Sequence, residues 1–408
     1  MNNSLTGLLV LPPHPCVNLS VLILSNNNFS GSIPTNIDVI FPNLRTLKLS
    51  QNCFEGKIAP SIGKMKSLWI LDPANNNLSG QIPQHLIMGC SSLAFLKLSY
   101  NNLYGKILPT ITNLTSLMLL YLDHNLFGGN LPDRDGPNYL SELDISHNNI
   151  SGALPSWLGN LSSLQSLVMR NNHLEGSIPS EFCQLHRLRY LDLSENDIQG
   201  LILSCFSSQY LEHVHLQKNR VDWWAFIPKC PAFERDSILR SNSSSIVPVE
   251  KSQHNGLVSQ LSLRFDTSCL NNITFKGESN SNGRRNSEVE LTGFGYMLSC
   301  IHIKVCFLDI KMIWGGEYIT VELEVEFTTK FRYEIYKGVV LELMSGIDLS
   351  CNKLVGNIPP EIGDLSDIHA LNLSHNYLNG QIPPSFSSLR KIESLDLSYN
   401  NLMGMIPP

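Results

Sequence analysis

The sequence predicts an α/β fold of the solenoid kind: a right-handed, curved superhelix with short parallel strands on its concave face, interrupted by one non-repeat island. Two observations predict the superhelix. Asparagines recur at steps of 23 to 25 residues within each run, and each lies between an apolar-x-apolar trio and a further apolar residue, usually followed by a glycine. The loss of this pattern between residues 222 and 339 predicts the island. The repeated asparagines are Asn27, Asn52, Asn76, Asn101, Asn125, Asn148, Asn172, Asn196, Asn219, Asn352, Asn376 and Asn400.

The residues of one copy explain the expected coil. Leu371 and Leu373 alternate with a polar residue, so both point to one face, as a half-buried short strand requires. Asn376 follows where the chain turns, and its amide can satisfy backbone groups that have no strand partner. Gly380 permits the next turn, and segments such as Pro155 to Leu161 predict a short helical or 3₁₀ turn on the convex side. The period is typical of leucine-rich repeats and differs from ankyrin, tetratricopeptide and propeller repeats.

We expect three parts along the chain. Residues 1–221 hold about nine repeats and a partial first one, residues 222–339 form a partly disordered island, and residues 340–408 hold three repeats, the last incomplete. Alternation from Tyr318 to Phe327 predicts a strand. Residues 293–315 fit neither the island nor a repeat, which suggests retained intron sequence. Because both ends fall inside a repeat, we expect the chain to be part of a longer protein.

The composition argues against several kinds of function. A formal charge of −6 gives no basic excess, so neither nucleic acid nor an anionic membrane surface is indicated as a partner. The ten cysteines lack C-x-x-C spacing. Disulfides are possible if the chain is secreted, but the sequence does not give their pairing, and the simpler interpretation of Cys90 and Cys183 is that they are buried repeat cysteines. His213 and His215 share a strand face without a third ligand, so we expect no metal and no cofactor. The sequence shows no catalytic signature, which indicates that the protein is not an enzyme.

The sequence contains ten Asn-x-Ser/Thr triplets, including Asn2, and nine of them are candidates for glycosylation if the chain is secreted. The competing interpretation is chance, because an asparagine-rich repeat generates such triplets by itself. The sites are Asn18, Asn28, Asn77, Asn113, Asn149, Asn160, Asn242, Asn272 and Asn372. This chain shows neither a signal peptide nor a membrane span in its sequence.

The order of the parts resembles one family closely. L-x-G-x-I-P repeats lead to an island entered by HVHLQKN, and the island ends in YKGVVLELMSGIDLSCNKLVGNIPPEIGDL, followed by ALNLSHN and ESLDLSYN. This arrangement resembles plant receptor-like proteins, which are cell-surface receptors with a leucine-rich ectodomain and no kinase. The likeness covers nearly the whole chain and is most specific after Tyr336.

The resemblance implies a fragment of the ectodomain of such a receptor, located at the extracellular face of the plasma membrane. It would sense an extracellular peptide, protein or glycan ligand and signal through co-receptor and adaptor receptor kinases in defence or development. Two alternatives remain open: a secreted inhibitor of pathogen wall-degrading enzymes, and a truncated product without function.

Variation among the outward strand positions indicates where a ligand binds. Repeats five to nine offer aromatic, charged and imidazole groups there, whereas the last repeats hold only Asp, Asn and Ser. A rigid concave array of such groups suits recognition of polar peptides or carbohydrates. The competing interpretation is a merely hydrated surface. The candidate ligand-binding residues are Tyr121, Asp123, His124, Asp144, Arg170, Asp192, His213 and His215.

Overall fold

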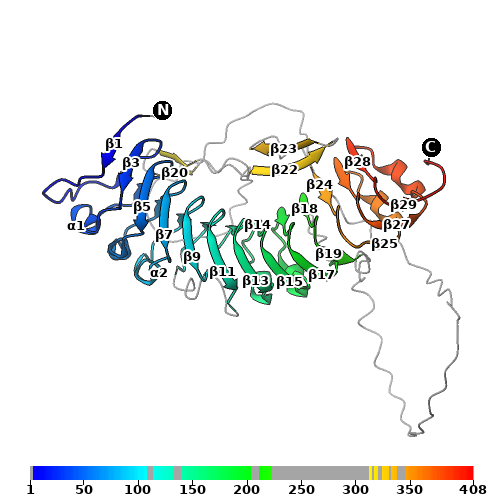
Figure 1. The fold of residues 1–408 in the computed structure, drawn as a ribbon, viewed down its shortest axis with the longest axis horizontal. Coiled ribbons are helices and arrows are strands. Elements are labelled where there is room, and N and C mark those ends of the chain that lie inside the picture. Colours follow the sequence, from blue (N-terminus) through cyan, green and yellow to red (C-terminus); the bar gives the residue numbers. More distant parts are fainter. Residues whose placement is uncertain are drawn as a thin grey trace, which may run out of the picture.

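The chain stacks its coils into an arc, as Figure 1 shows for the computed structural model. The structure describes residues 3–107, 114–132, 139–203, 211–222 and 345–407, together with four segments between residues 312 and 337 that are described as strands only. The sheets in the coils contain only parallel strands, and helical segments are few and short. The predicted solenoid of short parallel strands is therefore confirmed.

Twelve strands form the sheet on the concave side, and each coil contributes three residues to it. Neighbouring coils keep a constant register, for example Tyr121 beside Asp144 and Asp144 beside Val168. The strands are β2 (Val21–Ile23), β4 (Thr46–Lys48), β6 (Ile70–Asp72), β8 (Phe95–Lys97), β10 (Leu119–Tyr121), β12 (Glu142–Asp144), β14 (Ser166–Val168), β16 (Tyr190–Asp192), β18 (His213–His215), β24 (Gly346–Asp348), β26 (Ala370–Asn372) and β28 (Ser394–Asp396). Strands β14, β18 and β24 mark the inner side of the arc in Figure 1.

A second set of strands follows the repeated asparagines along the flank. Ten of them form one sheet: β1 (Thr6–Leu8), β3 (Asn28–Gly31), β5 (Cys53–Lys57), β7 (Asn77–Gly80), β9 (Asn102–Gly105), β11 (Leu126–Asn130), β13 (Asn149–Ala153), β15 (His173–Gly176), β17 (Asp197–Leu201) and β19 (Arg220–Asp222). Three more form a separate sheet: β25 (Val355–Asn357), β27 (Tyr377–Gly380) and β29 (Asn401–Leu402).

One position of the repeat differs at the break between the two flank sheets. In the other coils, the residue four positions after the repeated asparagine is a glycine with φ between 73° and 96°. After Asn219 this position holds Trp223 instead, which lies outside the described residues.

Short helical segments close the coils on the convex side. They are α1 (Ile37–Ile40), α2 (Gln84–Gly89), η1 (Pro60–Lys64), η3 (Ser156–Asn160), η4 (Ser180–Gln184), η8 (Pro360–Asp364) and η9 (Pro384–Ser388). The turn predicted between Pro155 and Leu161 is confirmed as the 3₁₀ segment η3. The backbones of segments η1 and α2 lie in direct contact. A Cβ atom added to Gly63 would lie only 2.1 Å from the carbonyl oxygen of His85, so only glycine fits at this position.

One apolar core runs through the described coils, from Ile33 to Leu389. The repeated asparagines join the coils at the edge of this core. The Oδ1 atom of Asn196 accepts a hydrogen bond from the N–H of Leu174 in the preceding coil at 3.0 Å. Its Nδ2 atom donates to the carbonyl oxygens of Leu193 in its own coil and Met169 in the preceding coil, at 3.1 Å and 3.0 Å. The predicted role of the asparagine amide is thereby confirmed.

The concave sheet continues across the predicted island. Strand β18 pairs directly with β24, with His213 beside Gly346 and His215 beside Asp348. The Oδ1 atom of Asn352 accepts from the N–H of Val221 at 3.2 Å, as in any other pair of adjacent coils. The coils before and after the interruption are therefore direct neighbours in one solenoid.

The described part of the island consists of two antiparallel strand pairs. Strand β20 (Met312–Trp314) pairs with β21 (Glu317–Ile319), and β22 (Glu324–Thr329) pairs with β23 (Arg332–Lys337). The stretch predicted as one strand, Tyr318 to Phe327, is thus divided between β21 and β22 of two different sheets. Residues 293–311, which hold most of the suspected intron sequence, lie outside the described residues. The division of the chain at 221/222 and 339/340 stays a prediction.

Candidate functional site

Seven of the eight candidate residues lie at or just after the ends of the concave strands. Tyr121, Asp144, Asp192 and His215 each end a strand, and their pairing places them in one row across the coils. Arg170, like Asp123 and His124, follows two or three residues behind its strand end. The eighth residue, His213, begins β18.

Two of the predicted carboxylates hold turns. Asp144 Oδ1 accepts from the backbone N–H and the Oγ of Ser146 at 2.9 Å and 2.7 Å. Asp192 Oδ1 accepts from the same two groups of Ser194 at 2.9 Å and 2.6 Å. The Oδ1 atom of Asp348, in a coil without predicted ligand contacts, accepts from the N–H of Ser350 in the same way, at 2.9 Å. The Asp-x-Ser turn is therefore a device of the fold wherever it recurs.

Burial raises the pKa of these carboxyl groups. The pKa of Asp144 rises to about 8, because burial and the neighbouring Asp123 disfavour the charged form and outweigh the hydrogen bonds from Ser146. Burial likewise raises the pKa of Asp192 and of Asp348. The row of strand ends thus carries less negative charge at neutral pH than its composition indicates.

Two predicted histidines form a buried aromatic cluster. His213 and His215 are 3% and 2% exposed, and their rings lie 6.5 Å apart between centroids. Both rings contact that of Tyr190, at 5.8 Å and 5.6 Å, so the histidines do face the same side of the strand, as predicted. Burial, assisted by the charge of Arg170, lowers the pKa of His215 to about 3, which keeps its ring neutral. At this exposure neither ring offers a ligand a contact surface in the present structure.

Tyr121 lies at the centre of a more open group. Its hydroxyl hydrogen-bonds the Glu142 carboxylate, and the Nζ atom of Lys97 lies 5.5 Å from the centroid of its ring. Burial and the neighbouring Glu142 raise the pKa of Tyr121. Burial also raises the pKa of Glu142, although the Tyr121 hydroxyl and Lys97 act in the opposite direction. Lys97 is exposed and supplies a positive charge beside an aromatic ring.

Arg170 belongs to a charged group that crosses three coils. Its Nη2 atom lies 3.0 Å from Glu195 Oε1, and Lys218 Nζ lies 2.7 Å from the same oxygen. Burial alone would raise the pKa of Glu195, but the hydrogen bond from Lys218 and the charge of Arg170 lower it. The group therefore presents two cations around one shared carboxylate.

His124 belongs to a stacked column that the sequence analysis did not identify. Its ring stacks on Tyr100 at 4.0 Å and on His147 at 4.1 Å between centroids. Asp123, which also accepts a hydrogen bond from the Ser99 hydroxyl, lies 3.1 Å from the Nδ1 atom of His124. The sequence does contain one indication of this column, because each of the three rings belongs to the residue directly before a repeated asparagine.

An apolar cluster separate from the main core lies on strands β6, β8 and β10. Ile70, Ala94, Phe95 and Leu119 are between 1% and 5% exposed, and Trp69 packs edge-on against Phe95 at 4.7 Å between centroids. Outward strand positions are solvated in most antiparallel and solenoid sheets, so this cluster marks where the concave surface is apolar. The partly buried residues Trp69, Met118 and Tyr121 pack against it.

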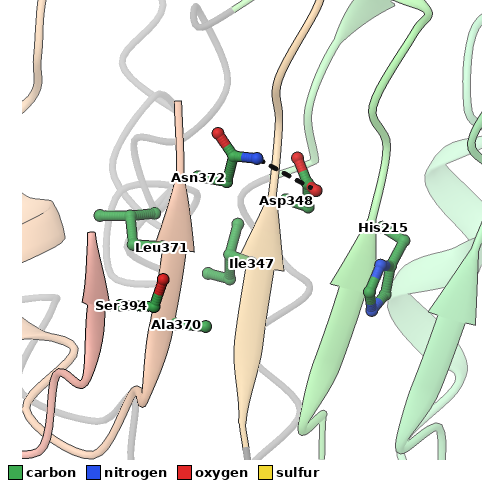
Figure 2. Close-up of a pocket in the computed structure, with 7 residues that line it drawn as sticks. All are labelled: His215, Ile347, Asp348, Ala370, Leu371, Asn372 and Ser394. Carbon is green, nitrogen blue, oxygen red and sulfur yellow. Dashed lines mark hydrogen bonds between the residues drawn. The ribbon is translucent and has the colours of Figure 1, made fainter. Parts of the chain in front are cut away.

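The concave surface also contains a small pocket, drawn in Figure 2, between strands β18 and β28. Its lining residues are His215, Ile347, Asp348, Ala370, Leu371, Asn372 and Ser394. The Nδ2 atom of Asn372 points toward the Asp348 carboxylate, at 3.4 Å from Oδ2. The free volume of about 10 Å³ is close to the room that one water molecule needs. The pocket is therefore too small for an organic ligand.

The predicted glycosylation sites differ in exposure. Asn18, Asn28, Asn77, Asn149 and Asn160 are exposed. Asn372 is buried at 9% exposure, and its amide is hydrogen-bonded to Asp348 and to Ser374. A glycan on Asn372 would have to displace these bonds. The remaining three predicted sites, Asn113, Asn242 and Asn272, lie outside the described residues.

The described cysteines include both free thiols and a disulfide-bonded residue. Cys90 is fully buried, as expected, and burial raises the pKa of its thiol to about 11. Cys183 was interpreted as a plain buried cysteine, and that interpretation is wrong, because Cys183 is disulfide-bonded. Cys16, Cys53, Cys90 and Cys351 are free. Among the described residues, no group of three or more metal-binding side chains comes together.

Two leucine-rich-repeat families match the chain. The Leucine rich repeat family matches residues 138–198 and 344–402, and a second family of the same description matches residues 18–39 and 43–65. No helix in the described segments is long and apolar enough to cross a membrane.

Similar curated proteins are plant receptors. Cuscuta receptor 1 of Solanum lycopersicum is 57% identical over 51 residues, which are 12% of this chain and 4% of that protein. Receptor-like protein 1 of Arabidopsis thaliana is 56% identical over 46 residues, 11% of this chain and 4% of that protein. Receptor-like protein 14 of the same plant is 36% identical over 103 residues, 24% of this chain and 10% of that protein. Each match thus spans a tenth or less of the relative.

Solved structures with the same fold include plant receptor ectodomains. The peptide hormone receptor RGFR1 in complex with RGF2 has a TM-score of 0.62 and 23% identity, covering 99% of this chain and 55% of that one. The HAESA ectodomain of Arabidopsis with an IDA peptide hormone has a TM-score of 0.62 and 22% identity, covering 98% and 49%. A leucine-rich-repeat protein of Leptospira interrogans reaches 0.51 at 21% identity, covering 94% and 79%. These likenesses establish the fold, which by itself does not determine function.

Proposed function

We propose that this chain, whose repeats match leucine-rich-repeat families and resemble those of plant receptor-like proteins, is the ligand-binding ectodomain of a cell-surface receptor. It binds an extracellular peptide, protein or glycan at its concave surface and has no catalytic activity of its own. Co-receptor and adaptor receptor kinases at the plasma membrane pass the signal on, in defence or development. Similar solved ectodomains carry peptide hormones, which supports a ligand of this kind.

The observation that carries this proposal is the change of outward side chains from coil to coil. Between Lys97 and Lys218 the positions at and just after the strand ends hold cations, carboxylates, imidazoles and a tyrosine, several of which pair across coils. The last coils instead repeat Asp or Asn followed by Ser, which serve the turn. A hydrated surface without a ligand has no need for such differences among coils of one backbone.

The accessible members of the candidate set are the ones to test. Tyr121, His124 and Arg170 keep part of their side chains exposed, whereas Asp192 and His215 are at most 4% exposed. We therefore place direct ligand contacts at Tyr121, His124 and Arg170, and a supporting role at the buried residues.

Binding of the secreted chain to a peptide array and a glycan array tests the proposal. Tyr121→Ala and Arg170→Ala should weaken binding at least tenfold, because each removes a group that faces the ligand. Lys66→Ala, a change of an exposed cation outside the concave strands, is the matched control and should leave affinity unchanged. Equal affinity of all three variants and the parent would refute the site. Inhibition of a fungal wall-degrading glycanase by the chain would instead support the inhibitor alternative.

Glycosylation fits the same setting. Asn28, Asn77 and Asn149 are the first residues of β3, β7 and β13, so glycans there would project from the flank sheet and leave the concave strands open. We propose that these three residues, with Asn18 and Asn160, carry the glycans. Peptide mass spectrometry of the secreted chain after deglycosylation in heavy-oxygen water should show Asn to Asp conversion at these five positions, and its absence from all of them would contradict the proposal.

A further inference from the structure

The stacked column has a fixed geometry that comes from the backbone. Tyr100, His124 and His147 all lie in the left-handed region, with φ of 54°, 51° and 50°. They occupy the same position in three consecutive coils, so their side chains leave the backbone in the same direction. Their rings are nearly parallel, with interplanar angles of 11° and 22°. The edges of two imidazoles therefore lie side by side at the spacing of the stack.

The partners of the two Nδ1 atoms determine where each ring carries its proton. Asp123 Oδ2 lies 3.1 Å from the Nδ1 atom of His124, and because a carboxylate only accepts, Nδ1 of His124 donates. The Nδ2 atom of Asn171 lies 2.8 Å from the Nδ1 atom of His147, and because an amide nitrogen only donates, Nδ1 of His147 accepts. In the neutral rings, Nε2 of His124 is then an acceptor and Nε2–H of His147 a donor.

The side chains of His124 and His147 are both partly exposed. Neither Nε2 atom has a hydrogen-bond partner within the described part of the chain, and the His124 side chain is 36% exposed. The pKa of His147 is lowered by burial and by the neighbouring His124 and Arg170, which favours the neutral ring with a single proton. The two stacked rings thus supply one acceptor nitrogen and one donor nitrogen.

We propose that Nε2 of His124 and Nε2–H of His147 bind the main-chain N–H and C=O of one residue in an extended peptide segment. In a strand, the N–H and the C=O of one residue point to the same side and bond to the same neighbour. The imidazole pair can occupy the place of that neighbour. This inference rests on the proposed function, because it specifies the ligand of that site as a peptide.

The fixed order of donor and acceptor favours a peptide over a sugar. A hydroxyl group can donate or accept by rotating its hydrogen, so a sugar gains nothing from a site that distinguishes the two roles. A peptide group cannot exchange its N–H for its C=O. A site with separate donor and acceptor therefore selects an amide backbone in one chain direction.

Nitrogen-15 NMR of the full chain with labelled histidine tests this inference. The probe is N-acetyl-L-alanine N-methylamide, whose central residue offers one N–H and one C=O. We expect saturable shifts of the Nε2 signals of His124 and His147, and signals are assigned with His124→Phe and His147→Phe, which keep a ring in the stack and remove the nitrogens. Each variant should bind the probe about tenfold more weakly, the loss expected for one hydrogen bond.

Two matched probes separate the outcomes. The analogue with a methyl group on the alanine nitrogen lacks the N–H and should cause no shift at Nε2 of His124. Methyl β-D-glucoside represents the sugar: shifts with it and none with the diamide would overturn the inference in favour of a glycan. No shift with any of the probes would also overturn it.

The peptide array distinguishes failure of this inference from failure of the proposed function. If array peptides bind the parent and the two phenylalanine variants equally, while Tyr121→Ala weakens binding, the imidazole pair is wrong and the receptor site stands. If the parent binds neither peptides nor glycans on the arrays, the proposed function itself fails.

Discussion

Replacing Asn172 with alanine tests the hydrogen bonds that join neighbouring coils. Asn172 is 5% exposed, and its Oδ1 atom accepts from the N–H of Ile150 in the preceding coil at 3.0 Å. Its Nδ2 atom donates to the carbonyl oxygens of Ile145, Met169 and Arg170 at 3.0 Å, 3.2 Å and 3.2 Å. Alanine removes all four bonds without changing the apolar core.

The magnitude follows from which groups lose their last partner. The three carbonyl oxygens keep a second donor: Asn148 Nδ2 for Ile145, Asn196 Nδ2 for Met169 and the N–H of His147 for Arg170. Only the N–H of Ile150 is left unsatisfied. A buried donor without a partner costs about 1–3 kcal/mol, so the free energy of unfolding should fall by about that amount.

Urea unfolding followed by far-UV circular dichroism measures the loss, from the shift of the midpoint at constant slope. Asn36→Ala is the control, because Asn36 is exposed and its side chain makes no capping hydrogen bond. The control should change stability by less than about 0.5 kcal/mol. Asn172→Asp keeps the acceptor for Ile150 but places a carboxylate oxygen against carbonyl oxygens, so it should cost more than alanine. A loss for Asn172→Ala no larger than that of the control, or a smaller loss for the aspartate variant, would refute the reasoning.

Three further predictions concern backbone strain, pH and the island. A Cβ atom on Gly356 (φ +84°) meets nothing within 4 Å, so Gly356→Ala should lower the free energy of unfolding only by the strain of the left-handed backbone, about 1–2 kcal/mol. A Cβ atom on Gly63 collides with the backbone, so Gly63→Ala should lower the urea midpoint further than Gly356→Ala does. The reverse order of the two midpoints would contradict this. The pKa of Asp144 is about 8 in the folded chain, against an ordinary value of 3.8. Between these two pH values the folded state therefore binds one more proton at Asp144 than the unfolded state. The free energy of unfolding then falls as the pH rises from 3.8 to about 8, by at most about 1.4 kcal/mol per pH unit. Asp144→Asn should flatten that slope in urea unfolding at pH 5 to 8, and an unchanged slope would assign it to other groups. Strands β18 and β24 pair as adjacent coils, so a connection of ordinary length should be able to replace residues 223–345. Residues 152–165 connect the same two positions in another coil, and a chain carrying a copy of them there should unfold in one cooperative transition and keep the strand signal in circular dichroism. An unfolded product would show that the island supports the solenoid.

The coils were predictable because their leucines and asparagines serve packing that every coil shares. Leu371, Leu373 and Asn376 have the same contacts as their counterparts in other copies, so the period alone identifies them. The strands of the island were less predictable. The alternation from Tyr318 to Phe327 indicates strand conformation but says nothing about pairing, and the structure assigns its two ends to different strand pairs.

The site was only partly predictable, because a side chain's position does not reveal its partners. Asp144 and Asp192 were chosen as outward carboxylates, yet the serine two residues later already indicates the turn that holds them. His147 was missed, since reading one repeat at a time does not show that its ring stacks on His124 of the coil before. Exposure was not predictable at all: His215 occupies the same strand position as Lys97, and one is buried while the other is exposed.

The position before each repeated asparagine connects the fold to the proposed function. Twelve non-glycine residues there adopt φ between 50° and 59°, a conformation that costs side-chain-bearing residues free energy. The repeated asparagine that follows holds the main chain in place with hydrogen bonds from its own side-chain amide. Asn125, directly after His124, does this without any contribution from the His124 side chain. The side chain at this position is therefore free to differ between coils, and it does, from Tyr100 through the two histidines to Lys218. Because the ladder of amides fixes the backbone, a column of variable groups can be presented in register, and that is the property that a binding surface for extended peptides requires.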